Sequence, residues 1–359
     1  MAITKIKVEN LTVFENMEMD IDANVNVIIG ENGTGKTHLL KFIYLACFGP
    51  MVFFPQEEQQ EMRETSAKTT RRFPFAERFF GKGINLSRDN ITDSTFQLFS
   101  GESIGAGYSL RLQQSRVYDF SFLREVFGPF DQGMKLNEIR EKMVFLPAKD
   151  MLTHSKGFLS LIRERGKQMP FDDTLINVIS KAGLPNLNET PELAKDILPK
   201  LEKEMDGIVV FENDEFFILK NDDQMLPFSV EAEGIKKIGL LWKLLMTGSI
   251  TEGSILLWDE PEANINPKLI PLLADIILEL GRNGVQIFLA THDYFLPEYI
   301  EALKEESDKV AFHSLYHTDN GVKCETKSAF SMLTHNTIID EKIRLYREAT
   351  EKVLGWEHM

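Results

Sequence analysis

The feature that most constrains the fold is a glycine-rich stretch near the N-terminus, GENGTGKT at residues 30–37. It matches the pattern G-x-x-x-x-G-K-[ST] at every defined position. The apolar segment VNVII precedes it and the apolar-periodic segment HLLKFIYLAC follows it, which predicts a strand, a turn and a helix. Glycines let backbone N–H groups surround phosphate oxygens, and the helix N-terminus adds the positive end of its dipole. The pattern therefore predicts a phosphate-binding loop.

Each residue of this loop has a predicted task. Lys36 is placed to reach the β- and γ-phosphates of a nucleotide, and the Thr37 hydroxyl is placed to bind Mg²⁺. The rest of the loop and the next helical residue are predicted to contact the nucleotide: Gly30, Glu31, Asn32, Gly33, Thr34, Gly35 and His38.

Two later segments carry polar residues at the end of a predicted buried strand. ILLW is followed by Asp259 and Glu260, and VQIFLAT is followed by His292. An aspartate there can hold Mg²⁺, the next carboxylate can deprotonate an attacking water, and a histidine can hydrogen-bond a γ-phosphate. The carboxyl edge of an α/β sheet is also where such folds bind ligands. We therefore predict Thr37 and Asp259 as metal ligands, and Glu260, His292 and Lys36 as catalytic residues.

The hydrophobic patterns predict a mixed α/β architecture. Alternating residues predict antiparallel strands in the first twenty residues and in two segments further on, 90–101 and 107–122. A helical block at 155–205 and a hairpin at 207–230 follow. From residue 231, helices alternate with buried strands, and this alternation predicts a parallel sheet. Asn266 and Asn336 are predicted to cap helices.

Composition excludes some classes of protein. The 359-residue chain has a formal net charge of −15, which disfavours a protein that coats nucleic acid but leaves a local basic groove open. The two cysteines, Cys47 and Cys324, lie far apart in sequence, so a reducing cytoplasmic compartment is expected. No signal sequence is visible, and no apolar run reaches the roughly 20 residues of a membrane span. We expect no membrane partner.

The order of the motifs GENGTGKT, ILLWDEPEAN and ATHD resembles the ABC-type ATPases that are not transporters. These include SMC-like heads, recombination-mediator ATPases and OLD-like ATPases, and DEPEANINP is similar to the OLD-type form. The resemblance implies ATP and Mg²⁺ as ligands. It also implies an α/β ABC-ATPase head, a P-loop NTPase fold with a mixed central sheet, an antiparallel β-subdomain and a helical lobe. We expect one head over 1–359, divided into an N-terminal lobe (1–150), a helical insertion (151–210) and a C-terminal lobe (211–359).

The family also has a signature motif that one head donates to the nucleotide of another. VEAEGIKKIGLL is its counterpart, with Ala232 where a serine is expected and Gly234 retained. Gly234 is expected to offer backbone donors to ATP, whereas the missing hydroxyl leaves the rate of turnover open. The family's glutamine-loop residue has three alternatives here, namely Lys149, Asp150 and Gln97.

The resemblance implies an ATPase whose nucleotide-dependent head association, as a head-to-tail homodimer or larger oligomer, controls an effector protein encoded nearby. Compact OLD-like ATPases of this kind are common in prokaryotic anti-phage defence. Two alternatives stay open: a recombination or repair ATPase that acts on DNA, and a nucleotide-binding scaffold with low turnover. The chain lacks the L-S-G-G-Q signature of transporters, the heptads of SMC arms and, after His292, the acidic triad of OLD nucleases.

Overall fold

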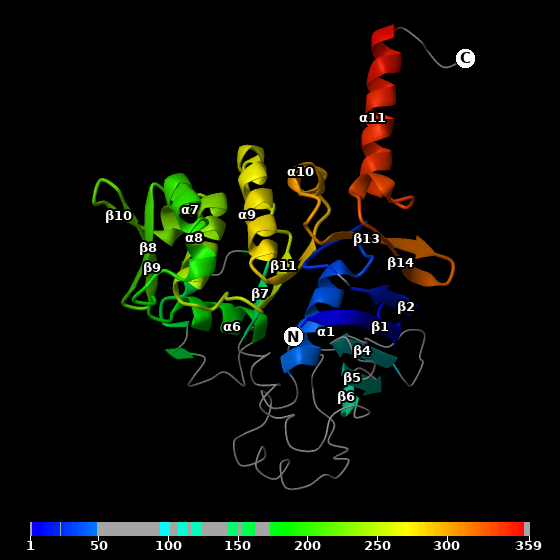
Figure 1. The fold of residues 1–359 in the computed structure, drawn as a ribbon, viewed down its shortest axis with the longest axis horizontal. Coiled ribbons are helices and arrows are strands. Elements are labelled where there is room, and N and C mark those ends of the chain that lie inside the picture. Colours follow the sequence, from blue (N-terminus) through cyan, green and yellow to red (C-terminus); the bar gives the residue numbers. More distant parts are fainter. Residues whose placement is uncertain are drawn as a thin grey trace.

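The computed structural model describes residues 2–21, 23–48, 94–100, 107–113, 116–123, 142–149, 152–158, 160–161 and 173–354. A six-stranded sheet lies at its centre, with the strand order β14-β13-β3-β12-β11-β7 (Figure 1). All neighbouring strands pair in parallel except β14, which runs antiparallel to β13. The strands are β3 (Val25–Gly30), β7 (Met143–Leu146), β11 (Ile255–Asp259), β12 (Gln286–Ala290), β13 (Val310–Thr318) and β14 (Gly321–Lys327). This arrangement confirms the predicted mixed central sheet.

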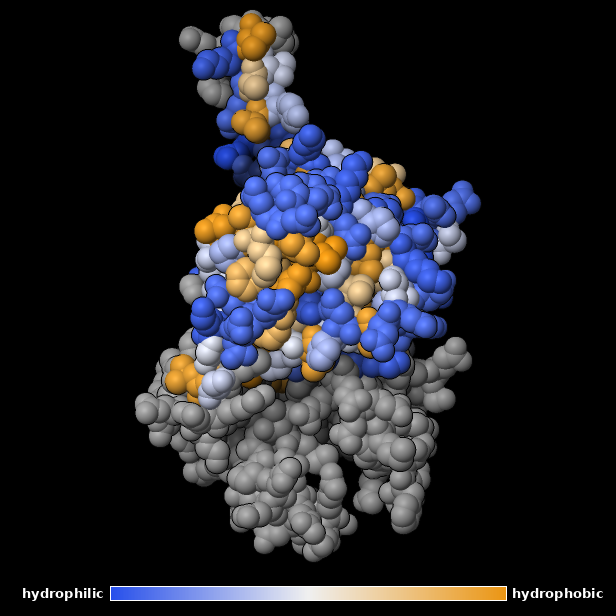
Figure 2. Space-filling model, turned by 90° about the vertical axis from the view of Figure 1, so that its left-hand side faces the viewer, coloured by the Kyte–Doolittle hydropathy of each residue, from blue (hydrophilic) through white to orange (hydrophobic). Residues whose placement is uncertain are grey.

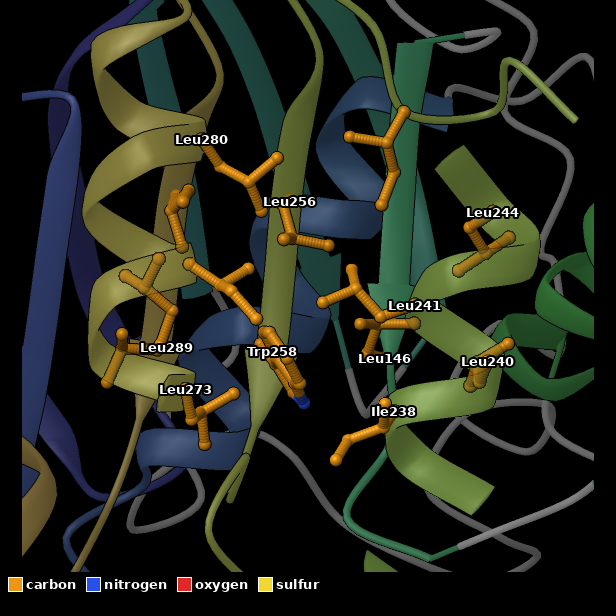
Figure 3. Packing of buried hydrophobic residues seen from close by; sticks show 14 of the residues in the cluster. Leu146, Ile238, Leu240, Leu241, Leu244, Leu256, Trp258, Leu273, Leu280 and Leu289 are labelled. Atoms are coloured by element: carbon orange, nitrogen blue, oxygen red, sulfur yellow. The ribbon is translucent and has the colours of Figure 1, made fainter. Parts of the chain in front are cut away.

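The central strands are continuously apolar because helices or strands cover both faces of the sheet. On β11, Leu256 and Trp258 point toward α8 (Glu233–Met246) and α9 (Ile270–Arg282), as Figure 3 shows. The alternate residues Ile255 and Leu257 belong to a second buried cluster that includes α1 (Lys36–Phe48). Two cores therefore fix the central sheet from opposite sides, and its carboxyl edge is held in place.

Two antiparallel sheets flank the central one. A five-stranded sheet has the order β2-β1-β4-β5-β6, and a three-stranded sheet has the order β10-β9-β8. The first contains β1 (Ile3–Leu11), β2 (Phe14–Asp20), β4 (Ser94–Ser100), β5 (Gly107–Gln113) and β6 (Arg116–Leu123). The second contains β8 (Gly207–Glu212), β9 (Glu215–Lys220) and β10 (Met225–Pro227). Both confirm strands that the alternating patterns predicted.

The remaining helices are α6 (Asp173–Ala182), α7 (Leu198–Met205), α10 (Phe295–Leu303) and α11 (Thr337–Leu354). Short 3₁₀ turns lie at η2 (Leu152–His154), η4 (Glu192–Ala194), η5 (Phe228–Val230), η6 (Pro267–Leu269) and η7 (Phe330–Met332). The two predicted caps are present: the Asn266 side chain accepts from the Lys268 N–H, and the Asn336 side chain from the Ile339 N–H. Within the described ranges, every helix is too short or too polar to cross a lipid bilayer. Helix α11 projects from the body (Figure 1).

Candidate nucleotide-binding site

The glycine-rich loop joins β3 to α1 in a turn that is too tight for larger residues. A Cβ atom on Gly30 would lie 2.4 Å from the Leu315 carbonyl oxygen. Gly35 has a φ of +88°, and a Cβ atom there would lie 2.9 Å from the ring of the fully buried Phe14. The loop therefore packs against β13 and against the turn between β1 and β2. These contacts hold its backbone in the curved shape that phosphate binding requires.

Lys36 lies folded back into this loop. Its ammonium group donates to the Gly30 carbonyl at 2.6 Å and to the Glu31 carbonyl at 3.0 Å. Burial lowers the pKa of Lys36, and the nearby carboxylates of Glu260 and Asp259 act in the opposite direction. A buried cation that has only carbonyl dipoles as direct partners gains from an anion, so the position fits a phosphate group.

Thr37 and Asp259 come from different elements and meet at the carboxyl edge of the sheet. The Thr37 hydroxyl lies 3.0 Å from each of the two carboxylate oxygens of Asp259. Burial raises the pKa of Asp259, and the Thr37 hydrogen bond opposes that shift. One carboxylate and one hydroxyl are the oxygen ligands with which proteins hold Mg²⁺ beside nucleotide phosphates. The two predicted metal ligands are thus adjacent and chemically suited to this ion.

Glu260 follows with a left-handed backbone, at a φ of +46°. Its N–H donates to the Ala290 carbonyl at 2.8 Å, which ties the end of β11 to the end of β12. The His292 Nδ1 atom lies 3.3 Å from the Glu260 carboxylate, and both side chains are partly exposed. Such a backbone is uncommon outside glycine and is often found at functional sites. The geometry leaves this carboxylate accessible and close to a histidine.

A cavity of about 970 Å³ opens beside these residues. Its walls come from the glycine-rich loop (30–32), the segments after β11 (260 and 262–264) and after β12 (292–294), and the start of α11 (337–338 and 340–341). A cavity of this size suits a nucleotide-sized ligand. No local pattern indicated that the last helix would reach this site, because only tertiary packing brings α11 there.

Lys237 is a second residue that the sequence patterns did not single out. It lies on α8 with 8% of its surface exposed, and its ammonium group donates to the Glu260 carbonyl at 2.9 Å and the Pro261 carbonyl at 3.4 Å. Burial lowers its pKa to about 8. A lysine within a helix is usually solvent-exposed, so its type and position indicated no role. Its contacts hold the backbone at Glu260, the predicted catalytic carboxylate.

We expect the Lys237→Met variant to lose a pH-dependent part of the stability. The Lys237 pKa is about 8 in the folded chain, against an ordinary value of 10.5 for a lysine. Between these values the unfolded chain binds more protons, so this residue's contribution to stability rises with pH across that window. Urea unfolding at the two ends of this pH window gives the free energy of unfolding at each pH. From the lower to the higher pH, this free energy should increase more for wild type than for the variant. Lys268→Met, at an exposed lysine, is the control; equal gains in all three proteins would contradict this prediction.

Gly234 and Ala232 lie apart from the cavity walls. Ala232 is exposed and immediately precedes α8, and Gly234 is buried in the first turn of that helix. A Cβ atom on Gly234 would lie 3.4 Å from the Cα atom of Ile265, so this turn packs on the loop after β11. The exposed residues at this helix start are therefore Ala232 and Glu233. Nucleotide contact by Gly234 stays a prediction.

The remaining predicted residues are the three glutamine-loop alternatives and His38. Lys149 is exposed and follows β7, which pairs with β11, so it lies at the same edge of the sheet as Asp259. Gln97 lies on β4 in the five-stranded sheet, opposite Lys7 and Ser109. Asp150 lies outside the described residues. His38 is half-buried in the first turn of α1, where burial lowers its pKa.

Comparison with protein families gives one assignment. Residues 25–296 match the family described as "AAA domain, putative AbiEii toxin, Type IV TA system". The chain belongs to this family.

Two solved structures share the fold. A structure described as "SmcHead bound to the C-winged helix domain of ScpA" has 12% identity and a TM-score of 0.56, with 92% of this chain and 98% of that chain covered. An Smc head from Pyrococcus furiosus has 11% identity and a TM-score of 0.50, with 97% and 99% covered.

Sequence similarity to curated proteins is confined to short stretches. The DNA replication and repair protein RecF of Bacillus mycoides (strain KBAB4) is 47% identical over 45 residues, which is 12% of each chain. The RecF protein of Oceanobacillus iheyensis is 37% identical over 59 residues, 16% of each chain. The chain therefore matches about one eighth to one sixth of the length of these relatives. Together with the family and the fold, these matches identify an ATPase family member with an SMC-head-like P-loop fold, as the motifs predicted.

Proposed function

We propose that this chain binds and hydrolyses ATP, and that the nucleotide state controls its association with a second copy and with an effector protein. The observation that carries the first part is the contact of the Thr37 hydroxyl with both oxygens of Asp259, beside the accessible Glu260. It brings a metal-binding pair and a general base from separate elements to one edge of the sheet.

The residues divide the chemistry between them. Mg²⁺ held by Thr37 and Asp259 would neutralise charge on the phosphate oxygens. Lys36 exchanges its two backbone carbonyl partners for phosphate oxygens, and the loop backbone donates to the same group. Glu260 orients a water and accepts its proton at the carboxylate, while His292 donates from its ring to the γ-phosphate.

The Lys36→Ala variant should lose ATP binding and ATP hydrolysis. The variant removes the cation that the loop directs at the β- and γ-phosphates, and we expect hydrolysis to fall at least about 100-fold. Steady-state phosphate release, compared between wild type and variant at the same protein concentration, measures this. Lys268→Ala, at an exposed lysine far along the chain, is the control. Equal phosphate release by wild type and Lys36→Ala would overturn the assignment of this activity.

The association with a second copy would complete the site. The start of α8, with Ala232 and Glu233 exposed, would face the ATP held by the other copy in a head-to-tail dimer or a larger oligomer. Its backbone N–H groups at a helix N-terminus suit a phosphate. The missing serine hydroxyl at Ala232 removes one donor, which is expected to lower turnover. The loop after β11, packed on Gly234, would link the two sites.

Helix α11 supports control of a separate effector protein. Its first turn lines the cavity, and Lys342 lies over the Tyr294 ring at 3.4 Å from the centroid, two residues after His292. Beyond this turn the helix carries exposed apolar side chains, Ile343 and Tyr346 among them. Figure 2 shows apolar residues along this projecting helix. An amphipathic helix that begins at the nucleotide and ends in solvent can transmit a change there to a partner with an apolar surface.

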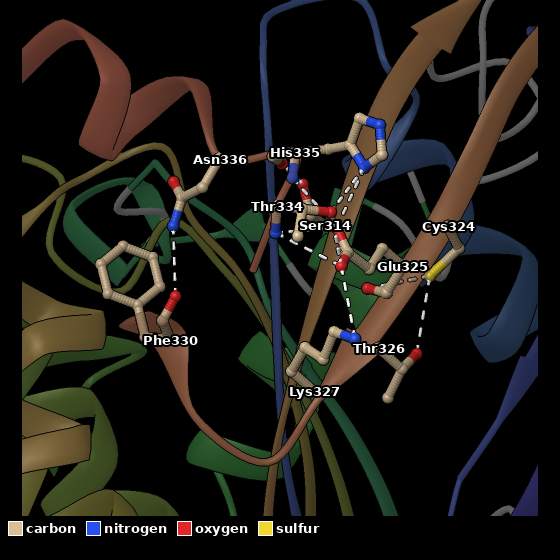
Figure 4. Close-up of polar contacts among 9 residues, drawn as sticks. All are labelled: Ser314, Cys324, Glu325, Thr326, Lys327, Phe330, Thr334, His335 and Asn336. Carbon is tan, nitrogen blue, oxygen red and sulfur yellow. Dashed lines mark hydrogen bonds and ion pairs between the residues drawn. The ribbon is translucent and has the colours of Figure 1, made fainter. Parts of the chain in front are cut away.

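The base of α11 is firmly attached to the central sheet (Figure 4). Glu325 on β14 accepts hydrogen bonds from the backbone N–H groups of Thr334 and His335, at 3.1 and 3.0 Å, and from both their side chains. These bonds lower the pKa of Glu325 to about 2, although burial opposes the shift. His335 also stacks on Tyr316 with ring centroids 3.8 Å apart. These contacts tie the start of α11 to β13 and β14.

We further propose that the controlled process is bacterial anti-phage defence, as in OLD-like systems. The family description, which names a toxin and a type IV toxin–antitoxin system, supports such a setting. An SMC head in complex with a ScpA domain supports the idea that this fold carries partner proteins. The effector would be encoded next to this chain and would act in the cytoplasm.

Substituting both Ile343 and Tyr346 with serine should separate the two activities. We expect ATP hydrolysis to stay within about two-fold of wild type, because neither residue lines the cavity, and defence to be lost. Phage plating efficiency on cells that carry the chain with its gene neighbours measures the second part. Arg344→Ser, on the charged face of the same helix, is the matched control. Full protection by the double variant would contradict a docking role for α11.

The RecF matches favour a second candidate, a repair-type ATPase that acts on DNA. Stimulation of hydrolysis by DNA would distinguish this candidate from the first. The net charge of −15 disfavours extensive phosphate contact.

A further inference from the structure

We propose that Glu262 and Thr291 are positioning residues for His292, and that their hydrogen bond couples the loop after β11 to the loop after β12. The kinetic part of this inference rests on the proposed ATP hydrolysis, whereas its structural part does not. Glu262 lies two residues after Glu260, and Thr291 immediately precedes His292. The Glu260–His292 pair and the Glu262–Thr291 pair therefore connect the same two loops.

The hydrogen bond is short and buried. The Thr291 hydroxyl donates to Glu262 Oε1 at 2.6 Å, and the two residues are 0% and 8% exposed. The same hydroxyl accepts from the Asp293 N–H at 2.9 Å. The Thr291 N–H donates to the Ile28 carbonyl of β3, also at 2.9 Å. The backbone before His292 is thus fixed by the Thr291 N–H, and the backbone after it by the Thr291 hydroxyl, whose direction Glu262 sets.

The far side of each loop is fixed as well. The Asp293 carboxylate accepts from the Leu296 N–H at 2.9 Å at the start of α10. Lys237 holds the carbonyls of Glu260 and Pro261. The Glu262–Thr291 bond joins these two supported segments, as does the 3.3 Å contact of His292 with Glu260. The position of the histidine relative to the Glu260 carboxylate therefore depends on the buried bond beside it.

Glu262 lies at the wall of the cavity, which it lines together with Glu260 and His292. One of its carboxylate oxygens accepts from Thr291, and the second, Oε2, is buried and has no hydrogen-bond partner among the described residues. A buried polar oxygen without a partner is costly, so stability alone does not account for this residue. The link to Thr291 therefore borders the site whose histidine it positions.

Two pairs of variants test the positioning role. Glu262→Ala and Thr291→Val remove the bond, and we expect each to lower kcat on the order of 10-fold or more with little change in the Kd for ATP. Glu262→Gln and Thr291→Ser keep an acceptor and a hydroxyl in place, and both should stay within about three-fold of wild type. Thermal unfolding of all four shows whether the loss of rate follows a loss of stability.

The decisive readout is a double-mutant cycle with His292→Ala. If Glu262 and Thr291 act through the histidine, Thr291→Val in the His292→Ala background should add less than about a two-fold further loss. If the losses of kcat in Thr291→Val and His292→Ala multiply in the double variant, the proposal is overturned. An unchanged kcat in Thr291→Val would also overturn it.

Amide hydrogen exchange over residues 291–296 provides a measurement without turnover. Exchange there should accelerate in Thr291→Val and Glu262→Ala and stay near wild type in Thr291→Ser. Unchanged exchange in the first two variants would overturn the link even if the chain hydrolyses ATP. If wild type and Lys36→Ala release phosphate equally, the proposed function fails, and the exchange result still decides the link.

Discussion

Glu260→Gln is expected to slow ATP hydrolysis by about 10²- to 10⁴-fold while ATP binding is retained. The amide has nearly the same shape as the carboxylate and can still contact His292, which lies 3.3 Å away. It cannot accept a proton from water at neutral pH. Thr37, Asp259 and Lys36 are unchanged, so the phosphate and metal contacts remain. Single-turnover phosphate release and equilibrium binding of a fluorescent ATP analogue separate the two quantities.

The cavity supplies a matched control for this variant. Glu341 also lines it, but from α11, where its carboxylate pairs with Arg344. Glu341→Gln removes a charge of the same sign from the same cavity and should change hydrolysis by less than about three-fold. A Glu260→Gln protein that hydrolyses ATP at the wild-type rate would show that another group is the base.

Gly30→Ala should destabilise the fold by about 2–4 kcal/mol and abolish nucleotide binding. The added methyl group would lie 2.4 Å from the Leu315 carbonyl oxygen and 2.8 Å from the Thr34 hydroxyl. Both belong to structure that is fixed by β13 and by the loop itself, so relief requires moving β3 away from β13. Urea unfolding gives the free energy of unfolding, and the fluorescent analogue gives the binding.

Gly33→Ala, in the same loop, is the matched control. Gly33 has a φ of +85°, but a Cβ atom there would meet no atom within 4 Å. Only backbone strain remains, which is worth about 1 kcal/mol. Equal loss of stability in the two variants would mean that left-handed backbone strain, and not the close approach to β13, is what destabilises Gly30→Ala.

The parts of the fold that follow from sequence are those in which local pattern and tertiary role agree. The segments VNVII and ILLW are apolar at every or nearly every position because both faces of their strands are buried, and this predicted the central sheet. The motif residues follow strand ends, and parallel pairing of β3, β12 and β11 brings those ends to one edge. The meeting of Thr37 with Asp259 was therefore predictable.

Other features depend on contacts that no local pattern encodes. Strands β13 and β14 were not predicted, and His313 lies fully buried on β13 with partners from Asn26 and Thr326. A histidine within a strand gives no sign of such burial. Lys237 and the Glu262–Thr291 bond act through backbone and side-chain partners from distant segments. The approach of α11 to the cavity is set by Glu325 at its base, which is a tertiary contact.

We propose above all that ATP bound at the Glu260 site brings two copies of the chain together. Light scattering of Glu260→Gln with and without ATP and Mg²⁺ measures this association, because this variant is expected to bind ATP and to hydrolyse it only slowly. We expect ATP to increase the measured mass by a factor of at least about two from its value without nucleotide, and Lys36→Ala to show no increase. The same mass for Glu260→Gln with and without ATP would show that ATP does not bring the copies together.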